Sequence, residues 1–219
     1  MNETVPLQPG RYYHLYHRGN NHENLFREER NYRYFLEQYA KYIRPIADTY
    51  AYCLLKNHFH VIVRIKTEDE WRRGLVQTSG VLTKIEVPAA NATKTPEVSI
   101  MAIRAFGNLF NAYAKAINKI YSRTGRLFEE SFKRIEVNSD TYFTNLIFYI
   151  HFNPQKHGFV RDFRKWPWSS YGAMQMNGVT NLKRRDVLNW FDGTTRFEQF
   201  HQGAVDEKMM TKLIADDFD

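Results

Sequence analysis

The chain has 219 residues, 43% of them hydrophobic and 25% charged, which suits one well-cored globular domain and argues against a disordered chain. Lysine and arginine outnumber aspartate and glutamate by 31 to 24, and the net charge of +7 favours polyanionic partners such as nucleic acid without requiring them. A single cysteine excludes a disulfide framework, and no apolar run approaches the roughly 18 residues of a membrane span, so we expect a cytoplasmic protein without membrane contact.

Four segments in the first part of the chain have strand or helix patterns. Residues 12–18 alternate between two faces and predict a strand, whereas residues 27–43 carry apolar side chains at helical spacing. Residues 46–55 and 58–65 predict two further strands, joined by a short turn. The order so far is strand, helix, strand, strand.

The pattern continues after an interruption. Residues 66–97 are polar with scattered Gly, Ser, Thr and Pro, and we interpret them as a variable, partly mobile insert. Residues 99–125 predict a long amphipathic helix, residues 131–138 a fourth strand, and residues 139–152 a helix that Pro154 ends.

The first six elements follow the order β-α-β-β-α-β. This order is typical of the α+β, ferredoxin-like (split βαβ) fold, in which helices cover one face of an antiparallel sheet. We expect the strands at 46–55 and 58–65 to be neighbours, with the helices at 27–43 and 99–121 on one face. Residues 155–219 have helical and irregular patterns and are expected to pack on the outside.

Two histidines stand two residues apart at the start of the predicted strand 58–65. Side chains alternate along a strand, so His58 and His60 share one face, whereas Phe59 and Val61 belong to the apolar face against the helices. Positions two residues apart are separated by roughly 6.6 Å, so the two rings can converge on one metal ion or one phosphate, and we expect them on the open face of the sheet. The alternative is a pair of half-exposed surface histidines, and a metal would need a third ligand.

The segment 145–160 offers the missing groups. Tyr149 and Asn153 are four residues apart, so a helix places a candidate nucleophile and a candidate third ligand on one face. This holds only if the last turn persists, because Pro154 disfavours helical geometry in the residue before it. The alternative for Tyr149 is a core aromatic in a chain with 14 tyrosines.

Positive charges gather near the connection 122–134 and at the first strand. An ordinary solvated face is the alternative, because Glu129 and Glu130 interrupt the cluster. Interpreted functionally, the cations contact phosphates, and Tyr12 and Tyr16 stack on unpaired bases. The candidate DNA contacts are Arg11, Arg18, Lys115, Lys119, Arg123, Arg126, Lys133 and Arg134.

Several stretches together resemble a known family. "NHFHVIV" (57–63) resembles the His-hydrophobic-His motif of the HUH endonucleases, and "YIHFNPQKHGFV" (149–160) with "WPWSSY" (166–171) resembles the catalytic helix and following segment of their single-tyrosine transposases. "YYHLYHRGNN" (12–21) and "LFNAYAKAINKIYSRTGRLFEESFKRI" (109–135) extend the resemblance. The REP-associated tyrosine transposases, relatives of the small insertion-sequence transposases, fit best.

The resemblance implies a division of the chain and a location. A HUH-type transposase domain would span residues 1–171, including the insert at 66–97, and residues 172–219 would form a C-terminal extension. The protein would act in the cytoplasm, associated with the nucleoid. A homodimer in which the helix serves a partner's histidines is allowed.

The resemblance also implies roles for the candidate residues. His58, His60 and Asn153 would bind a divalent cation, Mg²⁺ or Mn²⁺, although relatives often have glutamine at the position of the asparagine. Tyr149 would attack the scissile phosphate of single-stranded or hairpin DNA, leaving a 5′-phosphotyrosine and a free 3′ hydroxyl.

Two other functions remain open from the sequence. The first is a domesticated DNA-binding protein on the same fold that no longer cuts DNA. The second is a small metal-dependent hydrolase, which the absence of Glu or Asp beside the histidine pair disfavours.

Overall fold

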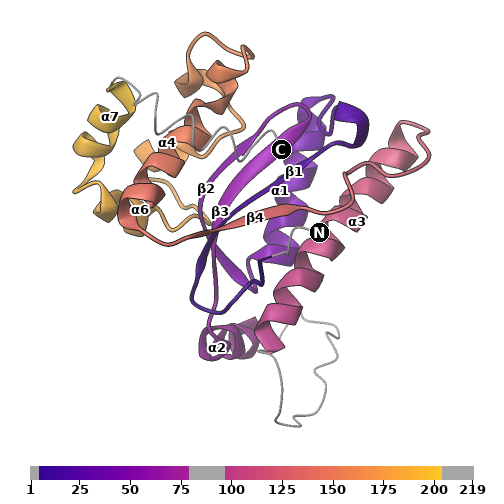
Figure 1. The fold of residues 1–219 in the computed structure, drawn as a ribbon, viewed down its shortest axis with the longest axis horizontal. Coiled ribbons are helices and arrows are strands. Elements are labelled where there is room, and N and C mark those ends of the chain that lie inside the picture. The colour runs from indigo at the N-terminus through magenta and orange to yellow at the C-terminus, as the bar shows by residue number, and fades with distance from the viewer. Residues whose placement is uncertain (1–4, 79–96, 204–219) are drawn as a thin grey trace.

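The computed structural model describes residues 5–78 and 97–203. One antiparallel sheet with the strand order β2-β3-β1-β4 forms its centre (Figure 1). The strands are β1 (Tyr12–Arg18), β2 (Ala47–Leu54), β3 (His58–Ile65) and β4 (Lys133–Val137). This order, with helices between β1 and β2 and between β3 and β4, confirms the predicted ferredoxin-like α+β fold.

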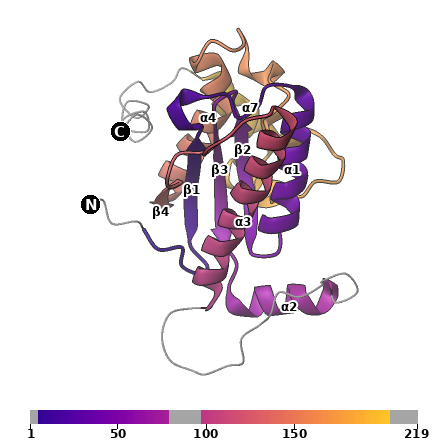
Figure 2. The ribbon, with the colours of Figure 1, turned by 90° about the vertical axis from the view of Figure 1, so that its right-hand side faces the viewer.

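Helices α1 (Glu29–Ile43) and α3 (Glu97–Ile120) lie side by side over one face of the sheet, as predicted (Figure 2). The alternation along the strands explains the core between the sheet and these two helices, because every second strand residue turns an apolar side chain to this face. Phe59 and Val61 of β3 and Phe35 of α1 are buried there.

The region interpreted as an insert contains regular structure. Helix α2 (Glu68–Thr78) begins three residues after β3, within the segment interpreted as a variable insert and at a place where no helix was predicted. Glu70 explains its start: its carboxylate accepts from the backbone N–H of Thr67 and pairs with Arg64 on β3. Residues 79–96 of the insert lie outside the described residues.

Helix α4 (Asp140–Lys156) covers the other face of the sheet, over β2 and β3 (Figure 1). Ser139 caps its first turn by accepting from the backbone N–H of Tyr142. The helix continues through Pro154 instead of ending before it, since the fixed φ of proline fits a helix and costs one backbone hydrogen bond.

The chain after α4 packs on the outer side of that helix. It contains η2 (Phe163–Lys165), α5 (Tyr171–Gln175), α6 (Arg184–Trp190) and α7 (Thr194–Gln202). Trp166 and Trp168 lie between these elements and the sheet: Trp166 Nε1 donates to the Leu54 carbonyl at 2.9 Å, and the Trp168 ring stacks on Tyr32. Both tryptophans therefore have packing roles. Within residues 5–78 and 97–203, no helix is long and apolar enough to cross a membrane.

Candidate active site

His58 and His60 lie on the sheet face opposite Phe59 and Val61, as the alternation predicts. This face is not open, however. His58 is 9% exposed and His60 is 1% exposed, because α4 packs its apolar side against β2 and β3. The expectation of an exposed histidine pair was wrong, since the same helix that carries Tyr149 and Asn153 also covers the pair.

Hydrogen bonds orient both rings. The Nδ1 atom of His58 donates to the Asn57 side-chain oxygen at 2.8 Å, which leaves Nε2 of His58 as the atom with a lone pair. The Nδ1 atom of His60 lies 3.0 Å from Nε2 of His14 on β1, so one of the two nitrogens donates to the other. The ring centroids of His58 and His60 are 5.1 Å apart. Partners of this kind are typical of metal-ligating imidazoles.

Burial keeps these imidazoles neutral at physiological pH. It lowers the pKa of His14 and of His58 to about 3 and the pKa of His60 well below the ordinary value. For His58, the positive charges of His157, Arg18 and Lys156 lower the pKa further. The unprotonated form is the one that can ligate a metal or accept a proton.

Tyr149 reaches the histidine pair from α4. Its ring centroid lies 5.9 Å from that of His60, edge to face, and its side chain is fully buried. Lys156, two turns further along α4, donates from Nζ to the Tyr149 hydroxyl at 3.1 Å, with the ammonium 4.7 Å from the ring centroid. Burial lowers the pKa of Lys156 to about 8. The hydroxyl of the candidate nucleophile is therefore held by a cation.

Asn153 is also fully buried on α4, one turn after Tyr149. Its Nδ2 donates to the Tyr149 carbonyl at 3.0 Å, whereas its Oδ1 accepts no hydrogen bond from any described residue. A buried amide oxygen without a donor loses free energy unless a cation or a water satisfies it. Among the described residues, no three His, Cys, Asp or Glu side chains are arranged to hold a metal ion, so a metal centre here would need Asn153. Two neutral imidazoles and this oxygen fit a divalent cation chemically.

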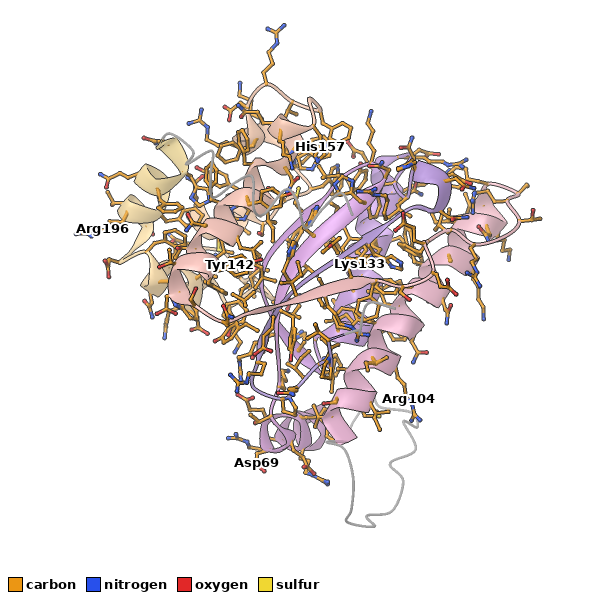
Figure 3. The ribbon with its side chains drawn as sticks, in the orientation of Figure 1. Asp69, Arg104, Lys133, Tyr142, His157 and Arg196 are labelled. Carbon is orange, nitrogen blue, oxygen red and sulfur yellow. The ribbon has the colours of Figure 1, made fainter. Side chains whose placement is uncertain are left out.

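Three residues near the pair were not singled out from the sequence. His14 stands opposite Ile62 on the neighbouring strand and bonds to His60. Lys156 and His157 belong to the quoted segment "NPQKHG". His157 stands at the C-terminal end of α4 and is labelled in Figure 3, and its ring centroid lies 5.1 Å from that of His58. The spacing of seven residues between Tyr149 and Lys156, two helical turns, was the available signal.

The predicted DNA contacts do not form one surface. Lys133 on β4 is exposed and shares the histidine face through its pairing with Tyr16, and Arg18 stands opposite His58. Arg134 points to the α3 face, where its guanidinium lies over Phe132. The other positions are on different elements: Arg11 before β1, Lys115 and Lys119 exposed on α3, and Arg126 exposed after it.

Arg123 has a structural role in place of the predicted phosphate contact. Its side chain is 11% exposed, its Nε donates to Glu23 at 2.9 Å, and its Nη1 donates to Asn118. These bonds fasten the end of α3 to the loop after β1. A buried guanidinium that is already paired is a poor phosphate contact, because the pair would have to break first.

Comparison with known proteins gives a likeness in fold. No family model matches the chain, and no curated protein matches it either. A solved structure described as a REP-associated tyrosine transposase bound to a REP hairpin matches with a TM-score of 0.57 and 14% identity, covering 82% of this chain and 88% of that one. At this identity the similarity shows a shared fold.

Proposed function

We propose that this protein is a metal-dependent, single-strand DNA endonuclease and strand transferase with Tyr149 as its nucleophile. The observation that supports the proposal best is the packing of Tyr149 on α4 against the histidine pair on β3, with Asn153 next to it on the helix. The Tyr149 ring packs on His60, the His58 and His60 rings adjoin, and the unsatisfied Asn153 oxygen lies one helical turn from Tyr149.

In the proposed reaction, the Tyr149 oxygen forms a bond to the scissile phosphorus, and the 3′ oxygen leaves with the electron pair of the broken bond. The phenol loses one proton and the departing 3′ oxygen gains one, so the step is balanced. The products are a 5′-phosphotyrosine and a free 3′ hydroxyl. Attack of a 3′ hydroxyl on the phosphotyrosine either reverses the cleavage or joins the strand to a new end, and neither outcome needs an external energy source. His58, His60 and Asn153 would hold Mg²⁺ or Mn²⁺, which polarises phosphoryl oxygens and neutralises developing charge.

The remaining residues of the site would manage the substrate's charge. Lys156 contacts the oxygen that becomes the phosphotyrosine ester, and its ammonium stabilises negative charge on that oxygen when the ester is broken again. Arg18 flanks His58 and adds positive charge near the incoming phosphate, whereas burial lowers the pKa of the neighbouring His157. The same cations disfavour a divalent ion in isolation, so substrate oxygens would complete its coordination.

The proposed substrate is DNA with a hairpin and an unpaired flank. The similar solved structure is described as bound to a REP hairpin, and the net charge of +7 favours a polyanion. Exposed Lys133 and half-buried Tyr16 lie on the histidine face next to the site, where an unpaired base would stack on the tyrosine.

A covalent-adduct assay tests the proposal. We expect wild-type protein with Mn²⁺ and a labelled hairpin oligonucleotide to give a band of slower mobility on a denaturing gel, and Tyr149→Phe to give none while still binding the DNA. Tyr142→Phe, on the same helix two turns earlier, is the matched control and should keep the band. A band that persists in Tyr149→Phe would assign the nucleophile to another residue.

A second candidate function is hairpin DNA binding without cleavage. The complete burial of Tyr149 favours it, because a nucleophile must reach the phosphate. Catalytic contacts often tighten only with substrate, so burial alone does not exclude attack. The absence of an adduct from wild-type protein that binds the hairpin would favour this second candidate.

A further inference from the structure

A cavity of about 510 Å³ lies on the other side of the sheet from the histidine pair. It is bounded by α1, by the outer edge of β2 and by the segment 180–183. Its size falls in the range of small-molecule sites, which runs from about 300 to 1,000 Å³. No residue of the candidate active site lines it.

The cavity exists because the edge of β2 is paired in two separate places. At one end of β2, the Leu54 backbone N–H donates to the Trp168 carbonyl and the Ser170 N–H donates to the Tyr52 carbonyl. At the other end, the Lys183 N–H donates to the Thr49 carbonyl at 2.9 Å. Between these pairings, residues 171–181 leave the strand edge and form α5 and the loop after it. The gap therefore comes from the backbone path.

Polar and apolar atoms contribute about equally to the cavity lining. Its half-buried aromatic rings are those of Tyr39 on α1 and Tyr52 on β2, and Phe35, Phe59 and Val61 lie buried behind them. The Tyr39 hydroxyl is bound to Thr49 at 3.0 Å, which fixes the ring at the wall. Flat aromatic walls suit a planar ring, because stacking recovers contact area with little loss of side-chain freedom.

The rim carries more positive than negative charge. Asp48 is the acidic residue of the lining, and it is shared by Lys66 at 4.0 Å, Lys183 at 3.6 Å and Arg64 at 2.9 Å. Arg64 is paired in addition with Glu70. Among the lining residues, the three cations Arg44, Lys66 and Lys183 face the single carboxylate of Asp48, an excess of two positive charges. Burial lowers the pKa of Lys66, which is the expected result for a cation that its neighbours do not fully compensate.

We propose that this cavity binds one nucleoside phosphate, with the base against the Tyr39 and Tyr52 rings and the phosphate at Arg44, Lys66 and Lys183. The ligand is either a free nucleotide or an unpaired nucleotide of the DNA substrate, and the second source rests on the proposed function. The site would give the protein a second contact with DNA, separate from the histidine pair.

Isothermal titration with deoxyadenosine monophosphate tests the site, with deoxyadenosine and inorganic phosphate as partial ligands. We expect the monophosphate to bind more tightly than either part. Lys183→Glu should weaken its binding about tenfold or more, because attraction is removed and repulsion added at once. Ala173→Phe should block the cavity with its ring, and Lys41→Glu, exposed on α1 and outside the lining, should change nothing. Thermal melting checks that each variant folds, and Lys183→Glu keeps the test valid if Ala173→Phe unfolds.

Two oligonucleotides distinguish the sources: a hairpin with an unpaired tail and the same hairpin without it. If the ligand is an unpaired nucleotide of the DNA, Lys183→Glu and Ala173→Phe should weaken binding of the tailed hairpin and not of the tailless one. If the ligand is a free nucleotide, both variants should bind both hairpins as the wild type does. No binding of the monophosphate, or equal binding by wild type and both variants, would overturn the proposal. The wild-type covalent adduct, measured on the tailed hairpin, reports separately on the proposed function.

Discussion

Two buried histidine clusters on α4's two sides differ in their surroundings. On the sheet side, His60 meets His14 at 3.0 Å, and on the outer side His151 of α4 meets His201 of α7, also at 3.0 Å. His151 Nε2 is also hydrogen-bonded to the Ser170 hydroxyl at 2.8 Å, and His201 Nδ1 donates to the Phe197 carbonyl, so each ring nitrogen of the outer pair has a protein partner. The outer pair thus fastens α7 to α4.

The difference lies in the neighbours and not in burial. Aromatic rings such as Phe197 and Tyr171 surround the outer pair, whereas the inner pair contacts Tyr149, whose hydroxyl accepts from the Lys156 ammonium and whose helix carries the unsatisfied Asn153 oxygen. A buried histidine pair by itself therefore indicates neither catalysis nor metal binding. The chemistry of the groups that face it decides between structure and function.

The largest expected difference between the clusters is in cleavage. His58→Ala and His60→Ala should each abolish the covalent adduct, because each removes a proposed metal ligand, whereas His151→Ala should keep the adduct. All three positions are buried, so each substitution should also lower the free energy of unfolding by about 1–3 kcal/mol, against the small cost expected for a surface pair. Adduct yield and urea unfolding measure the two effects. Loss of the adduct in a folded His151→Ala protein would contradict the distinction.

His14 should matter through His60. Its removal leaves the His60 ring without its partner on β1, and loss of such supporting groups lowers metal affinity or activity by about 10–100-fold. We expect His14→Ala to weaken Mn²⁺ binding by this factor in a titration followed by electron paramagnetic resonance. The matched change in the outer pair, His201→Ala, should leave Mn²⁺ affinity unchanged, and an equal loss in both variants would contradict a specific role for His14.

Lys156 should have a smaller effect on the reaction. Lys156→Met removes the donor to the Tyr149 hydroxyl, and we expect the rate of adduct formation at saturating DNA to fall roughly tenfold, about the value of a charge-assisted hydrogen bond. Lys156→Arg should recover most of the rate. If Lys156→Met alters DNA affinity and leaves the rate unchanged, the lysine contacts DNA and does not act on Tyr149.

The outer pair should make the fold sensitive to acid. Burial lowers the pKa of His201 to about 4, below its ordinary value of 6.5, so the unfolded chain takes up a proton that the folded chain refuses. The contribution of neutral His201 to the free energy of unfolding is fully present above pH 6.5. It declines as the pH falls toward 4, by about 3 kcal/mol in total. Urea unfolding at pH 7, 5.5 and 4.5 measures the slope. His201→Gln should reduce the slope and His22→Gln, at an exposed site, should not; equal slopes in all three proteins would refute the assignment.

Local patterns were enough for most of the fold. Alternation predicted β1 and β3 residue for residue, and helical spacing predicted α1 and α3 to within a few residues at most ends. One error has a local cause: Pro154 was taken to end α4, although a proline tolerates helical φ. Helix α2 was not predicted, and its start depends on Glu70 pairing with Arg64 on β3.

The candidate site was predictable in part. The faces of His58 and His60 and the spacing of Tyr149 and Asn153 follow from the periods of strand and helix. The burial of the pair and its bond to His14 depend on where α4 docks and on the register of β1 with β3, which involve residues distant in the chain. The ion pair of Arg123 could not be predicted for the same reason, since its partner Glu23 is 100 residues away.

Identification of the residue joined to DNA tests the central claim most directly. Wild-type protein incubated with Mn²⁺ and the hairpin oligonucleotide would be digested with trypsin and nuclease, and the peptide carrying a nucleotide would be sequenced by tandem mass spectrometry. The account predicts a nucleotide linked through a phosphodiester to Tyr149, in the peptide that ends at Lys156. A nucleotide linked to Tyr142, in the same peptide, or to any residue outside α4 would contradict it.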